Sequence, residues 1–169
     1  MRRVSALGLA VCVASSLNAQ SGGNPLRPLT KCVVTVTYAG KPDLNLPDSD
    51  RVRTIVELRS RTLGIRVLTV AEAARDPESI PLFDANITAI ALSNRGGVRT
   101  GLAYNLDLSL IEWTSVVRTH SAAPAILWTE GNLQSTGTDD IREVFERDLN
   151  NQLDKFANAL LRANPPQRP

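Results

Sequence analysis

Residues 101–110, GLAYNLDLSL, decide the fold because apolar and polar side chains alternate through the whole stretch. One set of alternate positions holds Leu102, Tyr104, Leu106, Leu108 and Leu110, and the other holds Ala103, Asn105, Asp107 and Ser109. Successive side chains of a strand point to opposite faces, so the pattern predicts a strand with one apolar and one wet face. It therefore favours an antiparallel sheet that is covered on one side only.

Further strands flank this stretch. Two consecutive glycines in SNRGGVR (93–99) are typical of a hairpin turn, which joins it to a strand over 86–92. Strand character continues through 113–117, and after the loop THSAAP (119–124) we expect a last strand over 125–133. Near the N-terminus, β-branched residues predict two more strands, over 32–38 and 65–70.

A first helix is predicted over 50–63. Its apolar residues recur at helical spacing, Ser49 is the expected N-cap, and Gly64 is the expected left-handed C-terminal cap. Arg59 falls on the apolar side of this helix, so either its stem packs while the guanidinium reaches water, or it forms a buried ion pair with a sheet carboxylate. Thr69 and Glu72 have capping-box spacing, which predicts one short helical turn after them.

The final helix carries an apolar stripe more than five turns long. Thr138 is the expected N-cap, with Asp139 and Asp140 in the first turn, and the helix ends before Pro165. The stripe consists of Ile141, Phe145, Leu149, Leu153, Phe156 and Leu160. Two helices on one face of a mostly antiparallel sheet make a two-layer α+β sandwich, which is the predicted fold class over residues 31–164.

Residues 1–19 have the layout of a secretory signal peptide. Arg2 and Arg3 precede a short apolar run, and small residues lead to Ala19; Ser16 offers a second cleavage site. An N-terminal core helix is the alternative.

We expect residues 20–30 to be a flexible arm and residues 165–169 to be a disordered tail. No segment after the leader is long and apolar enough to cross a membrane.

Removal of the leader changes the charge balance and the cysteine count. The 19 basic residues fall to 17 when Arg2 and Arg3 leave, which equals the 17 acidic residues. A neutral chain without a basic tract argues against nucleic acid as the partner. Cys32 becomes the lone cysteine, so we expect a buried thiol, with an intermolecular bridge as the alternative.

Few residues offer catalytic chemistry. His120 is the single histidine, and the sequence lacks HExxH, CxxC, Walker and G-x-S-x-G motifs, so we expect no metal, no cofactor and no enzyme. A hydrolase that uses His120 stays an alternative. Asp107, Glu112 and Glu130 could act as paired carboxylates, although Asp107 lies on the predicted wet face.

Three segments resemble a group of small exported bacterial proteins without an assigned function: VRTIVELRSRTLGIRVLT, AILWTEGNLQSTG and LDKFANALLRANP. The matching residues are Glu57, Arg61, Gly64, Ile65, Trp128, Phe156, Asn158, Ala159, Asn164 and Pro165. Ser60 departs from the pattern, since leucine is usual there. The order of elements is also similar to lipopolysaccharide-assembly and curli-secretion lipoproteins. The resemblance implies a structural scaffold and names no catalytic residue.

These features predict a non-catalytic exported module, periplasmic or secreted, that binds or assembles with other components of the bacterial envelope. The alternative is a carrier of a small or lipidic ligand held between helices and sheet. The expected partner is an unknown envelope protein or a second copy in a homo-oligomer. The hairpin over 116–133 is the favoured contact segment, and the candidate partner surface is Trp113, Trp128 and Glu130.

Overall fold

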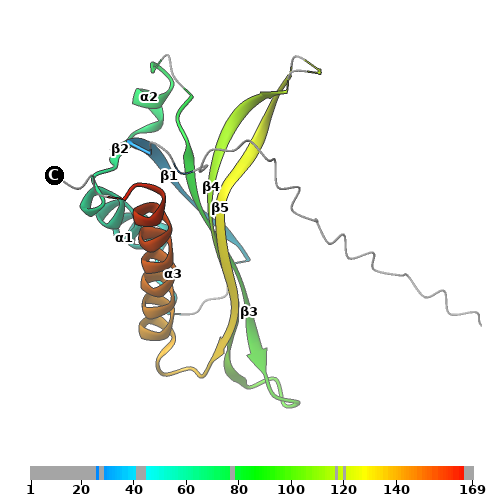
Figure 1. Cartoon of the computed structure of the whole chain (residues 1–169). Coiled ribbons are helices and arrows are strands. Elements are labelled where there is room, and N and C mark those ends of the chain that lie inside the picture. The colour runs from blue at the N-terminus through cyan, green and yellow to red at the C-terminus, as the bar shows by residue number, and fades with distance from the viewer. Residues whose placement is uncertain are drawn as a thin grey trace, which may run out of the picture.

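The computed structural model describes residues 26, 29–40, 45–76, 79–116, 118–119 and 121–165, so the predicted leader (1–19), most of the arm and tail, and His120 lie outside the described residues. Figure 1 shows the arrangement of the elements. In chain order they are β1 (Lys31–Ala39), α1 (Ser49–Thr62), β2 (Arg66–Leu68), α2 (Val70–Ala73), β3 (Leu82–Ser93), β4 (Arg99–Val116), β5 (Ser121–Thr136) and α3 (Ile141–Ala163).

The five strands form one sheet in the order β2-β1-β3-β4-β5. β1 runs parallel to β2 and β3, while the three longest strands, β3, β4 and β5, pair antiparallel. α1 and α3 lie on the same side of this sheet (Figure 1). The architecture is therefore a two-layer α+β sandwich, and the fold class predicted from the alternation in residues 101–110 is confirmed.

The core lies between the sheet and the two long helices. All five apolar residues of the alternating stretch are buried, and so is every residue of the predicted α3 stripe. Aromatic rings join the two layers: the ring centroids of Phe156 and Phe83 are 4.8 Å apart, those of Phe156 and Trp128 5.1 Å, and those of Tyr104 and Phe145 5.3 Å. Burial of each such side chain contributes about 1.5–3 kcal/mol, so this layer is the main source of stability.

One buried polar side chain connects α3 to the sheet. The Gln152 amide nitrogen donates to the Leu106 carbonyl at 2.9 Å and to Asn132 Oδ1 at 2.7 Å. Leu106 and Asn132 are opposite each other in β4 and β5. Because a buried amide is costly without partners, these bonds favour one placement of the helix along the strands.

The helix ends differ in part from the predictions. The N-cap of α1 is Asp48, whose carboxylate accepts from the Arg51 backbone N–H at 2.7 Å, and Ser49 is already helical. At the other end Gly64 has φ 80°, and the Ile65 N–H donates to the Ser60 carbonyl at 3.1 Å, as predicted for a left-handed cap.

The N-cap prediction for α3 was wrong. The helix begins at Ile141 with Asp140 as the cap residue, and no side chain caps it. Thr138 precedes the first helical residue by three positions, and its hydroxyl donates to the Asp139 carboxylate at 3.0 Å instead. An N-cap side chain must directly precede the first turn to reach its free N–H groups, and Thr138 stands too early in the chain.

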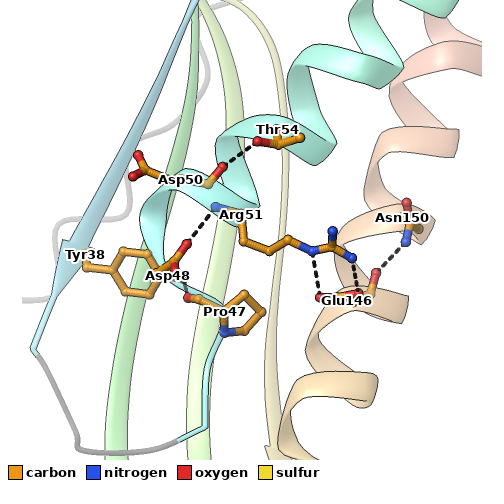
Figure 2. Close-up of polar contacts among 8 residues, drawn as sticks. All are labelled: Tyr38, Pro47, Asp48, Asp50, Arg51, Thr54, Glu146 and Asn150. Atoms are coloured by element: carbon orange, nitrogen blue, oxygen red, sulfur yellow. Dashed lines mark hydrogen bonds and ion pairs between the residues drawn. The ribbon is translucent and has the colours of Figure 1, made fainter.

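Ion pairs link the two helices, which run parallel. The Arg51 guanidinium donates to the Glu146 carboxylate, with Nε and Oε1 3.2 Å apart, as Figure 2 shows. Arg59 pairs with Asp154 two turns further on. The predicted alternative of a buried Arg59 pair with a sheet carboxylate is therefore wrong, since its partner is on α3 and both side chains are exposed.

The segment before α1 is held by the Tyr38 hydroxyl, which donates to the Pro47 carbonyl at 2.6 Å.

The strands also differ in length from the predictions. β2 is shorter than expected, β3 starts earlier, and β5 begins at Ser121 rather than after a loop ending at Pro124. Pro124 fits within β5 because an edge strand needs hydrogen bonds on one side only.

The pairing of β4 with β5 is interrupted once. The register shifts between Leu110 and Ile111, where Leu127 is an extra residue in β5. This β-bulge divides the strand into two parts.

Candidate functional site

The sheet face opposite the helices is lined at its centre by short polar side chains. Strand register places Asp84 opposite Ser109, Asn86 opposite Asp107, and Thr88 opposite Asn105. With Thr35 of β1 and Thr129 of β5, these residues form what we call the polar centre: Thr35, Asp84, Asn86, Thr88, Asn105, Asp107, Ser109 and Thr129. None of the eight is fully buried, so the predicted wet face exists.

Hydrogen bonds both between strands and along one strand order the polar centre. The Thr35 hydroxyl donates to Asp84 Oδ1 at 2.6 Å, and the Asn105 amide donates to the Asp107 carboxylate. Asp107 also lies over Gly131, its partner in β5, because a Cβ at Gly131 would come within 2.0 Å of Asp107 Oδ1. The Asp107 carboxylate thus fills the space that a side chain at position 131 would need.

Exposed apolar side chains flank the polar centre at both ends. Toward the β3–β4 hairpin, Ile90 is 61% exposed, and beside the polar centre Leu133, opposite Asn105, is 76% exposed. Toward the β4–β5 hairpin, Trp113 is 56% exposed and Ile126 is 65% exposed. Single exposed apolar residues are common, but Trp113 and Ile126 are neighbours across β4 and β5, and all four share one face with the polar centre, which makes this face the candidate interaction surface.

β5 forms one edge of the sheet, and no described strand pairs with its outer side. Natural edges are protected by lysine, proline or a bulge. Pro124 and the bulge at Leu127 protect the first part of β5. The part from Trp128 to Thr136, WTEGNLQST, has no lysine, arginine or proline, and we call it the free edge. Its one charged residue, Glu130, pairs with Lys155 of α3.

The three residues predicted as a partner surface lie on two different faces. Trp128 is half-buried on the helix-covered face, against Phe83 and Phe156. Glu130 shares that face, since it follows Trp128 by two positions in the regular part of β5 and alternate side chains of a strand point to the same face. Trp113 points to the uncovered face with the polar centre. The structure therefore keeps Trp113 as a surface residue and makes Trp128 part of the packing between the layers.

The acidic residues considered for catalysis are also separated. Asp107 is on the uncovered face, whereas Glu112 and Glu130 are on the helix side of β4 and β5. His120 lies outside the described residues. Within the ranges that the structure describes, no group of three or more His, Cys, Asp or Glu residues could hold a metal ion. The absence of enzymatic activity stays a prediction.

Two of the open hollows at the surface are lined by described residues. One of about 530 Å³ is at the start of α3 and is lined by Asn45, Asp139, Asp140, Ile141, Arg142, Glu143 and Glu146. Figure 2 shows that Glu146 is engaged by Arg51, and this hydrogen bond raises the pKa of Arg51. The other, of about 360 Å³, contains the pairs Lys31–Asp76 at 2.7 Å and Arg66–Glu72 at 3.7 Å. Both hollows are lined mainly by charged side chains.

Cys32 is a structural residue. Its side chain is fully buried in the core, and burial raises the pKa of the thiol to about 11. A thiolate is the reactive form of cysteine, so this thiol is protected both by its position and by its pKa. The expectation of a buried, inert Cys32 fits the structure, and an intermolecular bridge would require the core to open.

No protein-family model matches the chain, and no curated protein matches it. Among solved structures, a dodecamer of a PelC variant from Paraburkholderia phytofirmans is 13% identical, over 78% of this chain and 87% of that chain, with a TM-score of 0.45. A minor lipoprotein from Acinetobacter baumannii is 12% identical over 79% and 91%, with a TM-score of 0.35. Rare lipoprotein B from Shewanella oneidensis is 12% identical over 78% and 92%, with a TM-score of 0.30. The likeness is one of general chain arrangement.

Proposed function

We propose that this protein is a non-catalytic exported module of the bacterial envelope that binds or assembles with other components through its uncovered sheet. The observation that carries the proposal is the uncovered face itself. A hydrogen-bonded polar centre with four exposed apolar residues around it lies on the side of the sheet that α1 and α3 do not cover (Figure 1).

The composition of this face suits protein recognition. Protein interfaces combine apolar contacts, often aromatic, with about one hydrogen bond per 100–200 Å². On this face Trp113 and Ile126 offer apolar area, while Asp84, Asn105 and Asp107 offer amide and carboxylate groups. The free edge of β5 adds a second mode, since an extended segment can pair with an open strand.

The carrier hypothesis has less support. The space between helices and sheet is filled by fully buried side chains, among them Phe83, Tyr104, Phe145 and Phe156. The two hollows described above are open and charged, whereas sites for lipidic ligands are enclosed and mostly apolar. An uncovered sheet face is the better candidate.

Export is part of the proposal. Among the described residues, no helix is long and apolar enough to cross a membrane. When the full chain is expressed in a bacterial host, we expect the exported product to begin at or near Gln20 and to lie in the periplasm or the medium. N-terminal sequencing of the exported fraction measures this. Recovery of exported protein that still begins at Met1 would contradict it.

Partner retention tests the proposed face. Asn105→Arg places a long charged side chain in the polar centre, and Asn151→Arg places the same group on the exposed side of α3. We expect the first variant to lose components that are chemically crosslinked to the wild type in envelope fractions, and the second to keep them. Asn151 is exposed, so Asn151→Arg should change the free energy of unfolding by less than about 0.5 kcal/mol. Asn105 is half-buried and donates to Asp107, so Asn105→Arg costs more stability, and retention is compared at a temperature where urea unfolding shows both variants to be folded.

The same experiment distinguishes the alternatives. Equal retention by both variants would contradict the proposed face. Mass spectrometry that finds a lipid bound equally to both variants would support the carrier hypothesis instead, because a ligand between the layers does not touch residue 105 or 151.

A further inference from the structure

The free edge of β5, residues Trp128–Thr136, has the properties of a strand that pairs with itself. We propose that a second copy of this chain adds to this edge in antiparallel orientation, about a two-fold axis at Leu133, so that the two sheets become one continuous sheet. The inference goes beyond the proposed function, because it names a partner for the edge. It takes Leu133 into the pair and leaves the polar centre, Ile90, Trp113 and Ile126 available to others.

The charges of the free edge allow self-pairing. In a two-fold pair the same strand faces itself, so any charged residue near the axis meets its own copy, and like charges directly opposite each other are destabilising. Glu130 is the single charged residue of the free edge, and Lys155 already neutralises it. With the axis at Leu133, Glu130 lies opposite Thr136 of the other copy. An axis at Glu130 would instead bring two carboxylates together.

The apolar side chain at the proposed axis also favours this pairing. Leu133 is 76% exposed, the largest value among the exposed large apolar residues of the described chain. Two leucines directly opposite each other on antiparallel strands have Cβ atoms about 5 Å apart and shield one another from water. The remaining pairs are Asn132 with Gln134 and Gly131 with Ser135, which are polar or small and create no clash of charge.

The other edge of the sheet is a poorer partner for β5. β2 has three residues and pairs with β1 only at Lys31–Val33. β5 is antiparallel to β4, and β4 is antiparallel to β3, so β5 runs in the same direction as β3. β3 is parallel to β1, and β5 therefore runs in the same direction as β1. A head-to-tail contact between β5 and the rest of β1 would thus be parallel, and parallel pairing is less stable per residue.

The free edge is also the part of β5 without protective features. Upstream of it, Pro124 cannot donate a hydrogen bond, and the bulge at Leu127 breaks the regular spacing of donors and acceptors. Pairing is therefore confined to residues after the bulge. This restriction provides a matched control within the same strand, because Ile126 is also exposed but lies before the bulge.

Sedimentation velocity over a concentration series tests the proposal, with the full chain expressed and the exported product purified. We expect a dimer for the wild type and for Ile126→Lys. Leu133→Lys places two ammonium groups at the axis and should raise the dimer dissociation constant at least about tenfold. At protein concentrations low enough for both proteins to be monomeric, the melting temperature of this variant should match that of the wild type, because residue 133 is exposed in the single chain.

Disulfide trapping gives a second, independent measurement. Under mild oxidation, Leu133→Cys should form a covalent dimer, whereas Ile126→Cys and the wild type, whose Cys32 is buried, should not. Three results would overturn the inference: a wild type that stays monomeric across the series, a dimer that Leu133→Lys leaves unchanged, or trapping at position 126 as efficient as at 133. Any of them would leave the proposed function standing, since partner retention through Asn105 does not require the β5 pair.

Discussion

Phe156→Ala lowers the free energy of unfolding by about 3–5 kcal/mol, the cost of removing a large ring from a packed core. The Phe156 ring is buried and contacts both Phe83 of β3 and Trp128 of β5, so its loss leaves a cavity that neither strand can close alone. Urea unfolding monitored by circular dichroism measures the change.

Leu161→Ala is the matched control for this prediction. Leu161 is on the same helix but is exposed, and its replacement should change the free energy of unfolding by less than about 0.5 kcal/mol. An unchanged unfolding midpoint for Phe156→Ala would contradict the assignment of the α3 stripe to the core. The stripe would then have to face a partner.

The fold loses stability as pH rises above about 9, and this is the second large effect that we expect. Burial raises the pKa of the Cys32 thiol from 9.0 to about 11. Burial and the adjacent Asp148 carboxylate, which accepts the Tyr104 hydroxyl, also raise the pKa of Tyr104 well above its usual range. Both groups thus hold their protons in the folded state after the unfolded state has lost them.

The sign follows from proton binding. Between the unfolded and folded pKa of a group, the folded state binds more protons, so the free energy of unfolding falls as pH rises. For Cys32 the fall is about 1.4 kcal/mol per pH unit between about pH 9 and pH 11. Urea unfolding at a series of pH values measures the slope. Cys32→Ala should reduce the slope in this window, and a slope equal to that of the wild type would contradict the role of the thiol.

The sequence predicted those features of the fold that depend on periodicity. Alternation over residues 101–110 and the helical stripe from Ile141 to Leu160 each identify a buried face directly, and together they require two layers. Cap positions were less predictable, because Asp48 and Ser49 are both good caps, and only the geometry of the first turn selects between them. The start of β5 differs from the prediction because Pro124 is a poor strand residue everywhere except at an edge.

The candidate site could be predicted only in part. Asn105, Asp107 and Ser109 could be placed on a wet face from β4 alone. Their neighbours on β3 and β5 depend on strand register, which is a property of pairing and not of any single segment. Trp113 and Trp128 belong to the same β4–β5 hairpin, and regular side-chain alternation would place them on the same face. The bulge at Leu127 turns Trp128 to the opposite face, and a bulge is likewise a property of strand pairing. The contact of Asp107 with Gly131 has no sequence signal at all.

Site-specific photo-crosslinking in living cells tests the central claim most directly, namely that the uncovered face of the sheet is the binding surface. A photoreactive amino acid is introduced at Thr88, in the polar centre, and in a second variant at Asn151, on the exposed side of α3. We predict that the Thr88 variant crosslinks to a discrete envelope component and that the Asn151 variant does not. Crosslinks from Asn151 without any from Thr88 would place the binding surface on the helices and contradict the claim.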